Sequence, residues 1–270
     1  MNVWVNGEIV DASGAIDARD RGVTLGDGVF ETLAVVDGAP LRFARHMARL
    51  AAGAEALGIP LPYTSAALSD ALSGLCSDQG IAEGSARFTL LRGPARRGVA
   101  PPMDPVPTLM ITVASGIVGA AAPVRLIIAQ STRRNDRSPL AAIKSTNYLD
   151  AIIAAREAKA AGADDAILLN TNDMVCEATA ANIFCRFGDE LMTPPVSDGA
   201  LPGIMRACVL DAEDVVERSI TANDLRAADE VFLTSSLSVR PVTDIDGSVV
   251  GNGQAGEVAR RLADLPRRAG

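Results

Sequence analysis

Lysine is scarce in this chain. Its 270 residues include two lysines, Lys144 and Lys159, against 23 arginines. A guanidinium keeps its proton at every accessible pH, so the arginines can supply positive charge but not a nucleophilic amine. A partly desolvated lysine can lose its proton and attack an aldehyde. Lys144 and Lys159 are therefore the candidates for covalent Schiff-base chemistry.

Other features are also sparse. The four cysteines, at positions 76, 176, 185 and 208, have no C-x-x-C or zinc-ligand spacing, so we expect free thiols in a reducing compartment and no metal site. Every longer apolar stretch is broken by glycine, proline or charge, which excludes a membrane span. The N-terminal sequence MNVWVNGEIV has neither the charged start nor the apolar centre of a signal peptide. We therefore expect a soluble, cytoplasmic protein.

The overall composition is that of a globular protein with a small-molecule partner. Hydrophobic residues make up 48% of the chain and charged residues 21%, which is typical of a chain that folds around a core. The net charge of −8 argues against nucleic acid and anionic membrane surfaces as partners. Any anion that the protein binds must therefore meet a local basic site.

The first half of the chain has the pattern of a small α/β domain, which we place at residues 1–115. Two hairpins are expected, with turns at Asn6-Gly7 and Asp37-Gly38. Apolar spacing predicts a helix that begins near residue 43 and ends at Gly58, and a second helix over 64–79. Strands are expected at 86–93 and 108–115, with a proline- and glycine-rich loop between them.

The small-residue segment 116–123 is expected to link this domain to a larger one at 124–270. The second domain begins with a strand at 124–130 and continues with a helix over 147–161, which the apolar spacing of Leu149, Ile152, Ile153 and Ala160 predicts. Lys144 lies just before that helix, where the positive end of the helix dipole favours a free amine. Lys159 lies late in the helix and is expected to be a solvated cation.

Residues 176–206 predict a hairpin followed by a helix. Glu177 precedes the strand NIFCRF, which begins with Asn182. A turn at Gly188-Asp189 then leads to ELMT, and LPGIMR is typical of a helix that begins at a glycine. The unpaired N–H groups at such a helix start can bind an anion such as phosphate without net positive charge.

This segment resembles the signature of the class IV aminotransferases, the fold-type IV pyridoxal-phosphate enzymes. The resemblance rests on Glu177 with ATAANIF, on Leu191-Met192-Thr193, and on LPGIMR. Four further stretches resemble family landmarks in the family's order: DRGVTLGDGVFETL, RHMARL, IKSTNYL and VFLTSSLSVRPV. The resemblance covers almost the whole chain. It implies an α/β fold in two domains with the cofactor in the cleft between them, and a homodimer.

The resemblance also implies roles for individual residues. Lys144 would hold the aldehyde of pyridoxal phosphate as a Schiff base and then act as the general base at Cα. Glu177 would keep the pyridine nitrogen protonated, so that the ring accepts electrons. The other implied contacts are Arg49, Ile204, Met205, Ser236 and Leu237 around the phosphate, and Tyr148 near the phenolic oxygen. His46 is expected to cap or pack, without a catalytic role.

The family includes enzymes with different substrates. The chain is short for a branched-chain aminotransferase and has Ser145-Thr146 where that group has two glycines. Phe30 replaces a carboxylate-binding tyrosine of the D-amino-acid aminotransferases. The loop RGPARRG resembles that of the 4-amino-4-deoxychorismate lyases, so Arg97, with Arg87 as a second candidate, is expected to face a substrate carboxylate.

These features favour a lyase that forms 4-aminobenzoate and pyruvate. A transaminase of D-amino acids, branched-chain amino acids or (R)-amines, with a keto-acid acceptor, remains the alternative. A third reading, from another class, is a relative that binds pyridoxal phosphate without turnover. The presence of both Lys144 and Glu177 favours an enzyme.

Overall fold

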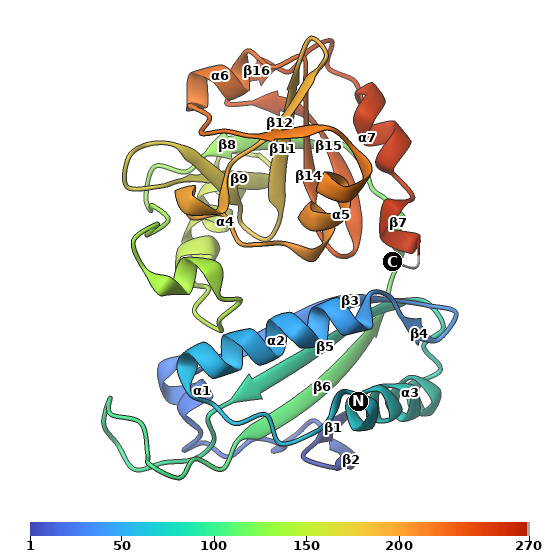
Figure 1. Ribbon diagram of the computed structural model, residues 1–270, viewed down its shortest axis with the longest axis vertical. Helices are drawn as coiled ribbons and strands as arrows, with labels where there is room; N and C mark the ends of the chain where they lie inside the picture. The colour runs from blue at the N-terminus through green and yellow to red at the C-terminus, as the bar shows by residue number, and fades with distance from the viewer. Residues whose placement is uncertain (269–270) are drawn as a thin grey trace. The chain divides into compact units, whose positions relative to one another are not determined.

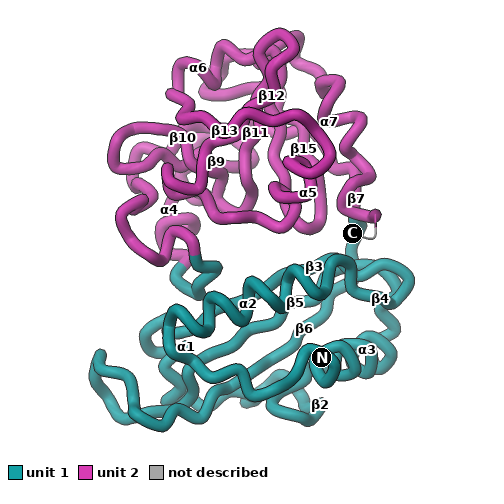
Figure 2. Tube along the Cα trace, in the orientation of Figure 1, with its two compact units in different colours: residues 1–118, 143–147, 269–270 teal, residues 119–142, 148–268 magenta. Residues whose placement is uncertain are grey.

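The computed structural model in Figure 1 describes residues 1–268. They form two compact units, coloured separately in Figure 2. The first comprises residues 1–118 and 143–147, and the second residues 119–142 and 148–268. The chain thus passes between the units after residue 118 and again on either side of residues 143–147. Within residues 1–268, no helix has both the length and the apolar character needed to cross a bilayer.

A six-stranded antiparallel sheet forms the base of the first unit, in the order β2-β1-β6-β5-β3-β4. The strands are β1 (Asn2–Val5), β2 (Glu8–Asp11), β3 (Gly28–Val36), β4 (Ala39–Pro40), β5 (Gly84–Leu91) and β6 (Thr108–Ser115). The expected hairpin turns are both present. Asn6 and Asp37 have φ of 47° and 53°, the left-handed conformation that such two-residue turns require.

Three helices complete the first unit: α1 (Arg21–Leu25), α2 (Phe43–Leu57) and α3 (Ser65–Gln79). The Thr64 side chain caps α3, and α2 ends at Gly58 in the left-handed conformation, as the sequence predicts. Strand alternation places Leu33 and Phe88 on one face of the sheet, where they pack in a single core with α2 and α3.

The segment 143–147 extends this sheet beside β3. The Phe30 N–H donates to the Lys144 carbonyl, and the Thr146 N–H donates to the Gly28 carbonyl, each at 2.9 Å. Ile143 packs against the core of the first unit. Lys144 therefore belongs structurally to the first unit, although its position in sequence had placed it within the domain at 124–270.

A larger sheet forms the second unit, in the order β10-β9-β8-β15-β14-β11-β12-β13, with β7 and β16 beside β15. Its strands are β7 (Gly119–Ala120), β8 (Val124–Ile128), β9 (Asp165–Leu169), β10 (Val175–Ala178), β11 (Asn182–Phe187), β12 (Glu190–Thr193), β13 (Val215–Glu217), β14 (Glu230–Thr234), β15 (Ser238–Ile245) and β16 (Ser248–Val249). Because β10 also pairs with β11, through Glu177 and Asn182, six strands close into a barrel.

Alternation along the strands separates the inside of the barrel from the outside. Ile183 and Leu233 belong to one core cluster, whereas their neighbours Phe184 and Phe232 stack at 5.2 Å in another, which packs against α5 and α7. The helices are α4 (Leu149–Ala160), α5 (Ile204–Ala212), α6 (Ala222–Arg226) and α7 (Glu257–Leu262). Single 3₁₀ turns occur at Pro139–Ala142, Val196–Asp198 and Leu265–Arg267.

Helix α4 lies where its apolar pattern predicts it, but the buried side is not the expected one. Ala154 and Ala158 pack against the barrel, whereas Leu149 is 74% exposed and Ile152 is 51% exposed. The large apolar residues whose spacing indicated the helix thus face away from the core of the second unit.

Candidate functional site

The Lys144 side chain lies against an aromatic ring of the first unit. Ser145 pairs with Val29, which faces the core, so Lys144 and Phe30 lie on the opposite face of the sheet. The Lys144 Nζ is 4.5 Å from the centroid of the Phe30 ring. Lys144 is half-buried, and its backbone is fixed by the pairing with β3. The structure therefore holds this amine in a defined place beside an apolar surface.

Arg87 contacts the same ring. Its guanidinium carbon is 3.6 Å from the centroid of Phe30, and its Nε–H donates to Thr89 Oγ1 at 3.3 Å. Stacking on an aromatic face orients the plane of a guanidinium, which presents its N–H donors in a fixed direction. Arg87 comes from β5 and Lys144 from the segment after β8. The structure thus brings both side chains into contact with the Phe30 ring.

Arg97, the other arginine expected to face a substrate, is exposed in the long loop between β5 and β6. Hydrogen bonds that start from Asp27 hold this loop in place. Asp27 accepts hydrogen bonds from Arg21 and Arg92, and Arg21 donates in turn to the carbonyls of Gly98 and Val99 at 2.8 Å. Burial opposes ionisation of Asp27, but the two guanidinium groups outweigh it and lower its pKa.

Arg49 forms a buried ion pair within the first unit. Its Nε and Nη2 donate to the two oxygens of Glu31 at 2.6 and 2.7 Å, a bidentate geometry. Glu31 is 1% exposed, and His46 Nδ1 lies 2.7 Å from its Oε2. Burial would raise the pKa of Glu31, but the contacts with His46 and Arg49 outweigh it and lower the pKa. His46 is thus neither a cap nor a simple packing residue, because it contacts this carboxylate.

Glu177 is fixed at the end of β10 in the second unit. Its Oε2 accepts the Leu201 N–H at 2.9 Å, and its Oε1 lies 3.2 Å from Arg134 Nη2. The side chain of Glu177 is 11% exposed. Since a buried carboxylate needs a compensating charge, the contact with Arg134 stabilises Glu177 in place.

Helix α5 begins at Ile204 and Met205, both buried, as the sequence predicts. Its N-cap, Gly203, has no side chain, so no side-chain cap among residues 1–268 covers the first N–H groups of this nine-residue helix. A Cβ on Gly203 would collide with Asn182 Oδ1 and would displace that side chain, which favours glycine at this position. Asn182 Nδ2 donates to the Leu201 carbonyl at 2.8 Å and fixes the approach to the helix.

Ser236 and Leu237 lie half-buried in the turn between β14 and β15. The turn is closed by Ser235, whose Oγ accepts the N–H groups of Leu237 at 3.3 Å and Ser238 at 3.2 Å. Tyr148 is half-buried at the N-cap position of α4.

Sequence reasoning missed the residues that hold these groups. Glu31 is hidden in an apolar strand sequence, VFETL, and Arg134 in a basic turn. The one available signal was the strand alternation, which places Glu31 on the core face with Val29 and Leu33, where a carboxylate requires a partner.

Comparison with known proteins gives the family. The amino-transferase class IV family matches residues 28–245. A Methanocaldococcus jannaschii protein assigned as a branched-chain-amino-acid aminotransferase is 33% identical, over 98% of this chain and 94% of its own. The D-alanine aminotransferase of Staphylococcus epidermidis is 30% identical, over 96% and 94%.

The fold agrees with this result. A solved Legionella pneumophila structure assigned as a 4-amino-4-deoxychorismate lyase superposes with a TM-score of 0.86 at 34% identity, covering 95% of this chain and 96% of that one. The match extends over both units, and the expectation of a fold-type IV α/β protein is confirmed. The chain belongs to the class IV aminotransferases, and it is a pyridoxal-phosphate-dependent enzyme.

Proposed function

We propose that the protein is an aminotransferase that acts at Cα of an α-amino acid, with Lys144 as its reactive amine and Arg87 as the residue that binds the substrate carboxylate. The observation that carries this proposal is the shared contact of Lys144 and Arg87 with the Phe30 ring. Among the arginines expected to face a substrate, Arg87 and not Arg97 makes this contact. The branched-chain and D-alanine aminotransferases among the relatives support transfer to a keto acid.

The residues present fit pyridoxal phosphate. Lys144 is a half-buried amine beside an aromatic ring, and Glu177 is a buried carboxylate in a fixed position. Gly203 leaves the start of α5 open for a phosphate, for which Ile204, Met205, Ser236 and Leu237 would provide contacts, with Arg49 and Tyr148 as further partners.

When bound, the cofactor supplies an aldehyde that captures amines and a ring that accepts the electron pair released at Cα. Glu177 would hold a proton on the ring nitrogen. Lys144 Nζ, released by the incoming amino group, would take the proton from Cα. Arg87 would hold the substrate carboxylate, which fixes the direction of the Cα–H bond. The donor leaves as a keto acid, and a second keto acid accepts the amino group.

Replacement of Lys144 tests the assignment of the reactive amine. We expect K144A to lose turnover and the visible absorption of the bound cofactor, while its circular dichroism matches that of the native protein. K159A removes the other lysine, which is exposed near the end of α4, and should retain both activity and absorption. Full activity in K144A would overturn the proposal.

Arg87 is tested by substrates with and without a carboxylate. Loss of a charge-assisted hydrogen bond weakens binding by about 10- to 100-fold, so R87Q should lower kcat/KM for alanine or leucine by that factor. The same variant should change little with 1-phenylethylamine, an amine that lacks the carboxylate. R97Q is the matched control. If kcat/KM fell in R97Q and not in R87Q, the substrate carboxylate would be assigned to Arg97 in the loop between β5 and β6.

The lyase that the sequence favoured is the second candidate here. The RGPARRG loop, held by Arg21, and the 34% identical structure assigned as a lyase favour it. Incubation with 4-amino-4-deoxychorismate, without any keto acid, separates the two reactions. Accumulation of pyruvate together with 4-aminobenzoate would establish the lyase, whereas exchange between amino acids and keto acids establishes the aminotransferase.

We further infer that a homodimer is the active form. The class IV family to which the chain belongs supports this inference, because the family resemblance implies a homodimer. Light scattering of the purified protein tests it, and a monomeric mass with full activity would contradict it.

A further inference from the structure

A small pocket lies at one end of the barrel in the second unit. It has a volume of about 120 Å³ and is lined by Asp165, Ala180, Ala181, Leu233, Ser235, Ser238 and Arg240. Asp165 is the first residue of β9, and Ala181 lies directly before β11. Ser235 and Ser238 flank the turn between β14 and β15. The ends of three barrel strands and one turn therefore form the walls, a place where barrels commonly bind ligands.

Arg240 enters the pocket from β15. It pairs in register with Leu233, so both side chains lie on the inner face of the barrel wall. Within residues 1–268, the structure gives the half-buried guanidinium of Arg240 neither a hydrogen bond nor an ion pair. The nitrogens of this guanidinium are not among the buried, unpartnered polar atoms of the described residues, so they are open to the pocket and available to an anionic group of a ligand.

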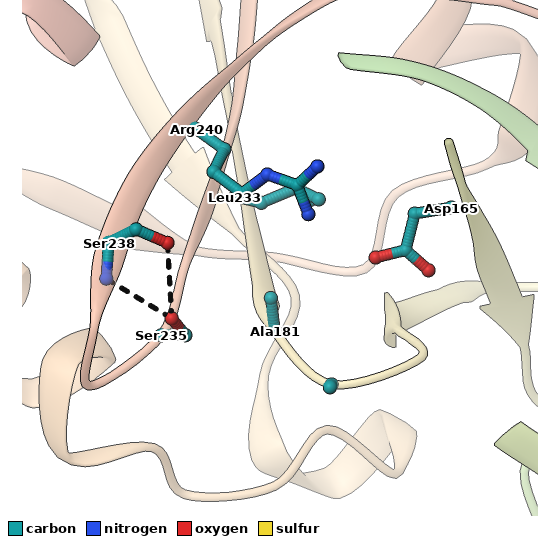
Figure 3. A pocket seen from close by; sticks show the side chains of 7 residues that line it. Asp165, Ala181, Leu233, Ser235, Ser238 and Arg240 are labelled. Atoms are coloured by element: carbon teal, nitrogen blue, oxygen red, sulfur yellow. Dashed lines mark hydrogen bonds between the residues drawn. The ribbon is translucent and has the colours of Figure 1, made fainter. Parts of the chain in front are cut away.

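Asp165 faces the pocket from another wall, and both charged side chains point into it (Figure 3). Asp165 is 8% exposed, and its Oδ1 accepts hydrogen bonds from Thr179 Oγ1 at 2.6 Å and from the Ala166 N–H at 2.8 Å. These bonds fix the carboxylate. Across the described part of the chain, no ion pair joins Asp165 to Arg240, so the pocket keeps the two opposite charges apart.

The separation of charges selects the ligand. A simple anion would pair with Arg240 but would face the carboxylate of Asp165, and a simple cation would face the opposite conflict. A molecule with a carboxylate at one end and an ammonium group at the other satisfies both. The pocket volume restricts such a zwitterion to a small one.

We infer that this pocket binds a small α-amino acid, with its carboxylate on Arg240 and the Ser238 hydroxyl and its ammonium group on Asp165. Ser235 and Ser238 flank the two residues proposed to contact the cofactor phosphate. A ligand here would therefore stiffen that turn, and by linkage it would change the affinity for the cofactor. The inference extends beyond the proposed reaction, because Lys144 takes no part in it.

Calorimetric titration of the borohydride-reduced holoenzyme with glycine and alanine tests the inference. Reduction fixes the cofactor to the protein, so no amino group can be transferred. We expect one binding event, weakened by about 10- to 100-fold in R240Q. R260Q, which changes an exposed arginine on α7, is the matched control and should bind like the native protein.

Half-ligands separate the two ends of the site. Acetate should bind more weakly than glycine and should depend on Arg240, while D165N should weaken glycine much more than acetate. Equal glycine affinity in R240Q and native protein would overturn the inference. So would binding of inorganic phosphate in place of glycine, or glycine binding only after the cofactor is removed. Turnover is assayed separately on unreduced enzyme, so failure of the proposed reaction leaves this result intact.

Discussion

Glu31 receives both the Nε–H and the Nη2–H of Arg49, at 2.6 and 2.7 Å, with its own side chain 1% exposed to solvent. A strand residue and a helix residue thus meet in a bidentate pair at the junction of β3 and α2. The pair fixes the direction of Arg49, the arginine proposed to bind the cofactor phosphate, before any ligand arrives.

Loss of the Glu31 charge should therefore destabilise the protein strongly. In E31Q the Arg49 guanidinium would remain largely buried without a compensating charge, and we expect the free energy of unfolding to fall by about 3–5 kcal/mol. Urea denaturation measures it. E8Q, at an exposed position on β2, should stay within about 0.5 kcal/mol of native. Equal midpoints for E31Q and E8Q would show that the pair contributes nothing.

The same pair predicts a pH dependence. The folded protein lowers the pKa of Glu31, because His46 and Arg49 outweigh the effect of burial. Its contribution is therefore complete above the unfolded pKa of about 4.3, and it is lost as the pH falls through the lower folded pKa. The difference in unfolding free energy between native protein and E31Q should be large at pH 7 and smaller near pH 3. A difference that grows in acid would contradict this assignment.

Gly203 gives a test of the helix start. In G203A the new methyl group would collide with Asn182 Oδ1 and displace the side chain that donates to the Leu201 carbonyl. We expect a loss of about 1–3 kcal/mol in stability and weaker cofactor binding, measured by absorbance titration. The matched control is G74A in α3, where a Cβ meets open space, and it should gain about 0.5–1 kcal/mol.

Asp27 should control the order of the loop between β5 and β6. In D27N the grip on Arg21 weakens, and with it the hydrogen bonds of Arg21 to the Gly98 and Val99 carbonyls. We expect trypsin to cleave after Arg96 and Arg97 several-fold faster than in the native protein. D17N, which breaks an exposed pair with Arg19, is the control. Unchanged cleavage in D27N would show that the loop is held by other contacts.

Much of the fold was predictable because its signals are local. The turns at Asn6-Gly7 and Asp37-Gly38 and the helix end at Gly58 each depend on residues within a few positions. The placement of 143–147 beside β3 could not be predicted, because it depends on two backbone hydrogen bonds between residues more than a hundred positions apart. The buried side of α4 was also missed, because alanines pack there while its larger apolar residues face outward.

Some residues of the candidate site could also be predicted from the sequence, and others could not. Lysine scarcity and the family signature indicate Lys144 and Glu177 directly. Their roles, like those of the other proposed contacts, stay predictions until the variants are measured. The roles of Glu31 and Arg134 could not be predicted, because each depends on a partner that is distant in sequence. Glu31 pairs with Arg49, and Arg134 pairs with Glu177.

The closure of the barrel has a mechanical consequence. Strands β10 and β11 are paired through a single residue pair, Glu177 with Asn182. Every other pair of neighbouring strands in the six-stranded barrel shares more residue pairs. Thermal breathing of a closed ring starts where the fewest bonds must break. Each such opening would free one edge of the Glu177 backbone, whose other edge stays paired with Leu168 of β9, so the carboxylate proposed to hold the cofactor ring would be supported from one side only while the pair is open.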